Sequence, residues 1–456
     1  MFSLPKRRLT TSLRYLSHGR IDSEVHRRAF HATAPTNVFK AAWMPMRVKT
    51  PFIDALMESR EKAKRGEVDQ GASAPKPDLT PRRMSDSYFA AVLPLAQDKW
   101  LLDQYLNASG RIRLGSLFMD LDAMAGVIAY RHTGDSVMTV TAAADRISLL
   151  NPLKEICDLE LSGQVTYATG RSSMEVSMQV TKAPKDGQKA KPEDVLLSCA
   201  FTMVSLDPAT KKPVAIAPIR LETEEERRLF QQGEENYKAK KAARNQNLQE
   251  QAPNDEEADM IHAMWKIENE LSNSNAPRPD NIIPMSSTKL ESTMLMQPED
   301  RNRHNFMIFG GFLLKHTFEL AFCCASSFAK GRPTFISLDP STFENPVPVG
   351  SMLYLRAVVA YTDPPLLHGS VAQSEQQQSR KYTRVQVRVE SQVRDIETGQ
   401  MKPTGVFNYT FIVPKEIHVM PKTYAEFMVW VDARRRAMHM DPSLAEKFPE
   451  FDRATE

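Results

Sequence analysis

The stretch "RNRHNFMIFGGFLLKHTFELAFCCASSF", residues 301–328, joins a polar run, a glycine pair and an apolar segment. The apolar residues after the pair recur at the spacing of one helical face, which predicts a long helix that begins at Gly310 and Gly311. Few polar residues interrupt this segment, so other parts of the chain must cover the helix widely. The positions of its apolar stripe are Leu314, Phe318, Phe322 and Ala325.

A second stretch, "RIRLGSLFMDLDAMAGVIAYRH" at residues 111–132, is a distorted copy of the first and indicates an internal repeat. From Gly115, 37 residues lead to Pro152, and from Gly311, 35 residues lead to Pro346. Both prolines follow an asparagine and precede a segment of alternating apolar and polar residues. The helix predicted in this copy has its own apolar stripe at Leu117, Leu121, Met124, Ala125 and Ile128.

Alternating segments follow each predicted helix and indicate half-buried strands. The first copy contains "SSMEVSMQV" and "LLSCAFTMVSL", and the second contains "YTRVQVRVESQV" and "GVFNYTFIV". Each copy is therefore one strand, one long helix and about four antiparallel strands, and "LLHGSVAQSEQQQSRKY" is a long hairpin loop in the second copy. A curved antiparallel sheet wrapped around a central helix is the hot-dog arrangement. We predict an α+β protein with two tandem hot-dog domains joined by a charged helical linker.

Shifts in composition divide the chain into six segments. The stretch between the repeats is dense in both charges and in helix formers, which predicts solvated linking helices. The tail contains a predicted packed helix whose basic end, "ARRRAMH", is expected to be solvated. The predicted segments are 1–36 (presequence), 37–84 (polar extension), 85–215 (first hot-dog domain), 216–283 (linker), 284–415 (second hot-dog domain) and 416–456 (helical tail).

The first 36 residues are rich in arginine and serine, poor in acids, and lack a continuous apolar core. This composition predicts a mitochondrial presequence, removed between Arg28 and Asn37, and a location in the mitochondrial matrix. A basic tail without a targeting role is the alternative.

Composition limits the other classes of function. The formal net charge of +3 gives no argument for nucleic-acid binding, and no apolar run is long enough for a membrane span. The cysteines lack the spacing of a metal site, so we expect reduced thiols in the core. They are Cys157, Cys199, Cys323 and Cys324.

The segments "RNRHNFMIFGGFLLKHTFELA" and "RIRLGSLFMDLDAMAG", with the paired Asn-Pro strands, resemble the double hot-dog acyl-CoA thioesterases, most of all their mitochondrial branch. The resemblance covers about residues 85–440. It implies hydrolysis of fatty acyl-CoA to a free acid and coenzyme A, without a metal or covalent cofactor. It also implies an acyl-CoA substrate and association into a homo-oligomer.

Thioester hydrolysis needs an activated water and donors that stabilise the carbonyl oxygen. The chain contains no Gly-x-Ser-x-Gly motif, so a carboxylate that activates water is the natural alternative. Gly310 and Gly311 fall where the free N–H groups and the positive dipole of the helix collect, which makes them oxyanion candidates. Asn305, just upstream, could add an amide donor or orient the water. A tight turn into the helix is the alternative interpretation of the glycine pair.

The first copy lacks these donors but has an acid. Ser109 stands at the position of Asn305, whereas Asp122 lies seven residues after Gly115, where the second copy has Phe318. The family resemblance implies one site assembled from both halves, with the acid from one and the asparagine from the other. The second site is then degenerate.

Helical periodicity alone does not choose between two acids. Asp120 and Asp122 flank Leu121 on the two edges of the apolar stripe, where either could be a solvated acid. The register against the family motif selects Asp122 as the base and keeps Asp120 in reserve.

Other residues are candidates for substrate binding. Arg171, Arg380 and Lys381 occupy matching positions before corresponding strands, and such cations commonly bind the phosphates of coenzyme A. His304 could contact substrate or be an ordinary loop histidine. Glu319 is a candidate helper or hydrogen-bond partner on the second helix.

Two other functions remain open from the sequence. A hot-dog enoyl-CoA hydratase would carry a histidine about five residues after its aspartate, and this chain has Val127 there. A non-catalytic acyl-CoA-binding protein with the same fold is the other alternative.

Overall fold

The computed structural model describes Glu61 and residues 77–438, apart from residues 154, 185–190, 246–247, 249–250, 276, 303–306 and 367–381. The predicted presequence and most of the polar extension lie outside the described residues. So do His304, Asn305, Arg380 and Lys381.

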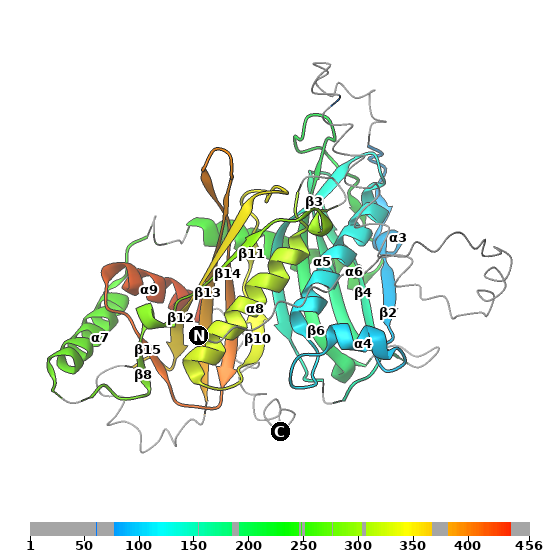
Figure 1. The fold of residues 1–456 in the computed structure, drawn as a ribbon. Coiled ribbons are helices and arrows are strands. Elements are labelled where there is room, and N and C mark those ends of the chain that lie inside the picture. Colours follow the sequence, from blue (N-terminus) through cyan, green and yellow to red (C-terminus); the bar gives the residue numbers. More distant parts are fainter. Residues whose placement is uncertain are drawn as a thin grey trace, which may run out of the picture.

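The two sequence repeats fold into the same order of elements: a strand, a long helix and a set of antiparallel strands (Figure 1). In the first half these are β2 (Phe89–Leu93), α5 (Leu114–Thr133), β3 (Met138–Leu149), β4 (Leu159–Ala168), β5 (Ser173–Lys182) and β6 (Val195–Leu206). In the second half they are β9 (Leu290–Leu295), α8 (Gly310–Ala329), β10 (Thr334–Leu338), β11 (Ser341–Thr342), β12 (Met352–Asp363), β13 (Thr383–Arg394) and β14 (Met401–Val413). The predicted α+β composition and the start of the second helix at Gly310 are confirmed.

These strands form one 11-stranded antiparallel sheet that continues from one half into the other. The strand order is β2-β4-β5-β6-β3 in the first half and β9-β12-β13-β14-β10 in the second, so equivalent strands hold equivalent places. The halves join edge to edge where β3 pairs with β10, with Ile147 opposite Leu338. Each of the five strands of the first half therefore has a structural counterpart in the second, which adds the short β11.

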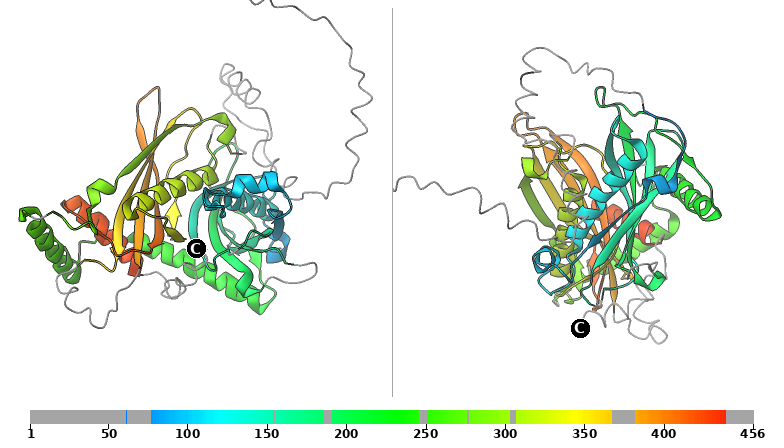
Figure 2. Two further views of the ribbon diagram at one scale, coloured as in Figure 1. Left: turned by 60° about the horizontal axis from the view of Figure 1, so that its bottom comes forward. Right: turned by 90° about the vertical axis from the view of Figure 1, so that its right-hand side faces the viewer.

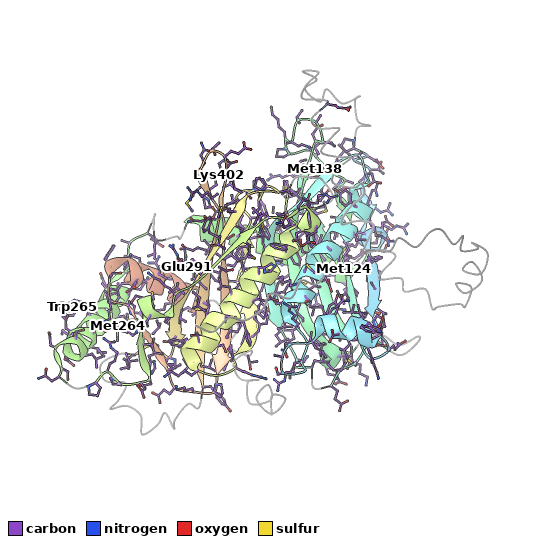
Figure 3. The ribbon with its side chains drawn as sticks, in the orientation of Figure 1. Met124, Met138, Met264, Trp265, Glu291 and Lys402 are labelled. Carbon is purple, nitrogen blue, oxygen red and sulfur yellow. The ribbon has the colours of Figure 1, made fainter. Side chains whose placement is uncertain are left out.

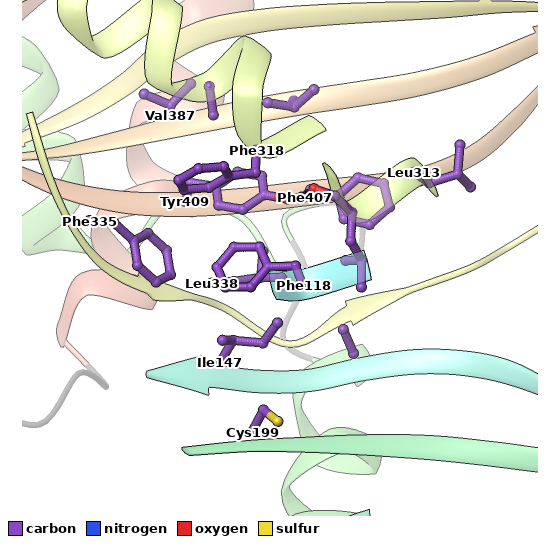
Figure 4. Close-up of a cluster of buried hydrophobic side chains, with 14 of the residues drawn as sticks. Phe118, Ile147, Cys199, Leu313, Phe318, Phe335, Leu338, Val387, Phe407 and Tyr409 are labelled. Atoms are coloured by element: carbon purple, nitrogen blue, oxygen red, sulfur yellow. Dashed lines mark hydrogen bonds between the residues drawn. The ribbon is translucent and has the colours of Figure 1, made fainter. Parts of the chain in front are cut away.

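The two long helices lie side by side on one face of the sheet (Figure 1). Their apolar stripes face the strands and each other, and all five predicted stripe residues of α5 are buried. The centre of the core is aromatic: Phe118 of α5 and Phe318 of α8 meet edge to face with ring centroids 5.0 Å apart, beside Phe335 and Tyr409 (Figure 4). In the predicted α8 stripe, Phe322 is half-buried and the other three residues are buried.

The linker helix α6 (Glu224–Asn245) packs along β4, on the side of the sheet away from α5 and α8 (Figure 2). Lys240 pairs with buried Asp145 at 2.9 Å, and Asn236 donates to Glu175. Burial, followed by the charge of Asp145, raises the pKa of Glu175 to about 7. Most of the described side chains of α6 are exposed, as its composition predicted, but Lys240 departs from that expectation because it pairs with a buried acid of the sheet.

The second linker helix, α7 (Asp255–Asn273), packs with Met264 turned inward and Trp265 outward (Figure 3). The tail helix α9 (Tyr424–Met438) buries Trp430, as its pattern predicted. Its basic end is not free: Arg435 pairs with buried Glu257 of α7 at 2.7 Å, so the expectation of a solvated end was wrong.

Short elements complete the described chain. β1 (Arg82–Arg83) pairs with β7 (Ile219–Arg220), β8 (Ile282–Pro284) pairs with β15 (His418–Met420), and the remaining helices and turns are α3 (Met84–Ser87), α4 (Lys99–Tyr105), Pro192–Asp194, Met285–Thr288 and Pro298–Asp300. None of the described helices has the length and apolar character needed to cross a bilayer.

The four cysteines are free thiols, but Cys323 is exposed and Cys157 half-buried, which corrects the expectation that all lie in the core.

Candidate active site

The packing of α5 against α8 brings Asp122 to the start of α8. The backbone N–H of Gly311 donates a hydrogen bond of 2.6 Å to Oδ2 of Asp122, although 189 residues separate the two. The N-cap residue of α8, Phe309, provides no side-chain acceptor. Asp122 therefore caps this helix from the neighbouring one, at the positive end of its dipole.

The glycine pair is required by this contact. A Cβ at Gly311 would lie 2.8 Å from the backbone oxygen of Met119 and 2.9 Å from its Cα. A Cβ at Gly310 would lie 3.0 Å from Oδ2 of Asp122. All three distances are too short for an ordinary contact, so side chains there would force the helices apart or displace the carboxylate.

Asp122 is 1% exposed and holds two hydrogen bonds. The second comes from the hydroxyl of Thr141 on β3, 2.7 Å from Oδ1. Burial raises the pKa of Asp122 to about 6, although the bonds from Thr141 and Gly311 lower it. A carboxyl group with a pKa close to neutrality can accept a proton from water and release it again near physiological pH.

Asp120, the reserve acid, has a different environment. It is 1% exposed and accepts a short hydrogen bond from the phenol of Tyr105 on α4. Burial, together with the charge of Asp120, raises the pKa of Tyr105, so the phenol keeps its proton. The alternative that either acid is solvated is excluded, because both carboxyl groups are buried.

The equivalent position in the other half contains no free acid. Phe318 lies in the aromatic core, and the adjacent Glu319 accepts from Nε of Arg113 at 2.8 Å. Arg113 is the N-cap residue of α5, and a Cβ at Gly115 would lie 3.4 Å from Oε1 of Glu319. Glu319 thus faces the start of α5 rather than Asp122, and an ion pair occupies the counterpart of the Asp122 contact.

The remaining sequence candidates divide into two groups. Arg171 is exposed on the turn between β4 and β5. Ser173 at the start of β5 pairs with Val204 of β6, and Val204 also pairs with Val140 of β3. The turn that contains Arg171 therefore lies at the same end of the sheet as Thr141. The structure describes neither the loop residues His304 and Asn305 nor the pair Arg380 and Lys381.

Sequence reasoning missed Thr141. Its only signal was a polar residue between the apolar neighbours Val140 and Ala142, and many strand threonines have that pattern. Within the described ranges, no three His, Cys, Asp or Glu side chains converge in the way that a metal ion requires.

Comparison with known proteins places these features in context. No family model matches the chain. The chain is 34% identical to the human (Homo sapiens) mitochondrial acyl-coenzyme A thioesterase 9 over 368 residues, which cover 78% of each protein. It is 32% identical to the mouse (Mus musculus) mitochondrial acyl-coenzyme A thioesterase 10, over 81% of this chain and 82% of that protein.

The comparisons also found a plant relative and a bacterial structure. The chain is 33% identical to the chloroplastic acyl-coenzyme A thioesterase 2 of Humulus lupulus, over 69% of this chain and 72% of that protein. Among solved structures, the putative oleoyl thioesterase of Lactobacillus plantarum is 10% identical and matches 71% of this chain and 95% of that chain, with a TM-score of 0.36.

Proposed function

The chain belongs to the acyl-coenzyme A thioesterase family, and we propose that it hydrolyses fatty acyl-CoA with a water activated by Asp122. The site lies between the two halves, where α5 meets the start of α8. The observation that carries this proposal is the 2.6 Å hydrogen bond from Gly311 to a buried carboxylate of the other half. Such a pair joins a base and a set of backbone donors within one site.

In the proposed reaction, the carboxylate of Asp122 takes a proton from water as the water oxygen attacks the thioester carbonyl. The C–S bond then breaks, and the sulfur receives that proton as it leaves as the thiol of coenzyme A. Burial keeps the pKa of Asp122 at about 6, so most of the carboxyl groups are ionised at pH 7 and above. Thr141 and Gly311 hold the carboxylate in one orientation.

The developing charge on the carbonyl oxygen needs donors other than the Gly311 N–H, which already binds Asp122. Among the described residues, the N–H of Gly310 has no hydrogen-bond partner. We propose that this N–H, with the amide of Asn305, forms the oxyanion site. The role of Asn305 is inferred from the sequence alone.

Coenzyme A carries phosphates that cations commonly bind. We propose that Arg171, Arg380 and Lys381 provide such contacts and that His304 contacts substrate. The proposed contact by Glu319 is the weakest of the set, because Arg113 already binds its carboxylate. No resident cofactor takes part in the proposed reaction.

We also propose that the segments 85–215 and 284–415 are two hot-dog domains, each with one central helix. The matched strand orders of the two halves support this division. In this proposal 216–283 is the linker and 416–456 the helical tail. Association of the chain into a homo-oligomer stays a proposal from the family resemblance.

The test is hydrolysis of acyl-CoA substrates of increasing chain length by the protein without residues 1–36, with a thiol reagent detecting coenzyme A. We expect release of coenzyme A from at least one chain length. A protein that binds acyl-CoA but releases no coenzyme A at any length would instead be a binding module.

The proposed base predicts a specific pH dependence. A general base works in its ionised form, so kcat should rise as the pH increases through about 6 and become level above it. Because the Thr141 hydroxyl lowers the pKa of Asp122, Thr141→Val should move this rise to higher pH and lower kcat more at pH 6 than at pH 8. Thr139→Val is the control, since Thr139 lies on the same strand but bonds Ser205. A flat profile in the wild type between pH 5 and 8 would contradict the role of Asp122.

The N-terminus and the mitochondrial names of the relatives support a mitochondrial location, which we propose to be the matrix. A fluorescent protein fused to residues 1–40 should enter mitochondria and lose its leader. Replacing the arginines before residue 31 by glutamine should abolish import, because a presequence depends on positive charge. A diffuse cytosolic signal from the unchanged fusion would refute the assignment.

A further inference from the structure

A cavity lies beside the start of α5, whereas the Gly311 contact lies at the start of α8. It has a volume of about 740 Å³, within the usual range for small-molecule sites. It opens between the start of α5, the middle of α8 and the neighbouring ends of β3, β4, β6 and β10. Its apolar walls include Leu117, Leu153, Leu159, Leu197, Phe318 and Phe322.

This cavity is the structural counterpart of the proposed active site. Ser109 lines it at the position that aligns with Asn305, and Phe318 lines it at the position that aligns with Asp122. Glu319 is the only carboxyl group among the described lining residues. A terminal guanidinium nitrogen of Arg113 (Nη2) lies 2.5 Å from its Oε1. The cavity therefore stands at the counterpart of the proposed active site and has no free base among its described lining residues.

Two further cations line the cavity. Arg111 is half-exposed and Arg332 exposed, and among the described residues neither side chain has an ion-pair partner. An apolar wall with free guanidinium groups at its border matches a ligand that has a long apolar chain and an anionic head.

We propose that this cavity binds a long acyl chain with an anionic head, either a fatty carboxylate or an acyl-CoA, and does not hydrolyse it. The chain lies against the leucine and phenylalanine walls, and Arg111 and Arg332 receive the head. Binding here does not require hydrolysis at Asp122, so the two proposals can fail separately.

Cys323 offers a direct probe, because its thiol is exposed and lines the same cavity. The experiment measures the rate at which N-ethylmaleimide alkylates Cys323, by mass spectrometry of its peptide, in the full chain with Asp122→Asn. If Asp122 is the base, this variant keeps an added thioester intact, and the palmitate arm does not depend on that role. Palmitate and palmitoyl-CoA are the two arms, and butyrate, with the same head but a short chain, is the ligand control.

We expect palmitate, palmitoyl-CoA or both to slow alkylation by about tenfold or more, while butyrate has no effect. The arm that protects identifies the head group. Arg111→Glu and Arg332→Glu should each raise the half-protecting concentration about tenfold, whereas Arg228→Glu, an exposed arginine on α6, should leave it unchanged. Unchanged alkylation in both arms would overturn the proposal, as would equal protection in the charge-reversed cavity variants.

Discussion

Asp122→Asn is expected to lower kcat for acyl-CoA hydrolysis by at least about 10²-fold, the lower end of what general-base catalysis contributes. The amide has nearly the shape of the carboxylate and keeps an oxygen that can accept from Gly311. Because it cannot take a proton from water, turnover should fall while the protein stays folded. The measurement is coenzyme A release at substrate saturation, with thermal unfolding as the check on folding.

Asp120→Asn is the matched control, since it changes an equally buried acid two residues away on the same helix. Its amide oxygen can still accept from Tyr105, so kcat per folded protein should stay close to that of the wild type. Loss of turnover in Asp120→Asn together with an active Asp122→Asn would transfer the role of base to Asp120.

Gly311→Ala is expected to destabilise the protein by about 1–3 kcal/mol, the usual cost of overpacking. Its Cβ would lie 2.6 Å from Cε1 of Phe309 and 2.8 Å from the backbone oxygen of Met119. Backbone atoms cannot rotate away, so the start of α8 must move from α5 and lengthen the Gly311 bond to Asp122. The measurements are the free energy of unfolding by denaturant and kcat, which should also fall.

Gly126→Ala separates this effect from a general effect of alanine. Gly126 lies inside α5, and a Cβ there would meet no atom within 4 Å. Alanine is the better helix former, so this variant should gain about 0.5–1 kcal/mol in the free energy of unfolding. Equal stability of the Gly311→Ala and Gly126→Ala variants would show that the helices do not need their close approach.

Local pattern was sufficient for the two long helices and their apolar stripes, whereas the meeting of Asp122 with the glycine pair was implied by the family resemblance. An apolar stripe at helical spacing must face a core, and a glycine pair at a helix start marks either a close contact or a ligand. Both interpretations of the pair were open from the sequence. The contact of Gly311 with Met119 supports close packing, and the bond to Asp122 explains why the packing occurs there.

Local sequence pattern could not predict which groups contact the charged side chains. Thr141 reaches Asp122 from β3, whose pairing with β6 shifts register between Thr141 and Ala143, and such a bulge changes which side chains point inward. Lys240 on the linker helix looked solvated because the buried acid that it contacts lies 95 residues earlier, at Asp145. The ion pair of Arg113 and Glu319 likewise depends on how the halves pack together.

The two halves are proposed to form one catalytic site, and kcat of Asp122→Asn, Asn305→Ala and the double variant tests this most directly. If both residues act in one site, each single change lowers kcat by at least about tenfold, and the double variant is about as slow as the slower single variant. If each half instead had its own site, each single variant would retain roughly half of the wild-type kcat and only the double variant would be inactive. That second result would contradict a shared site.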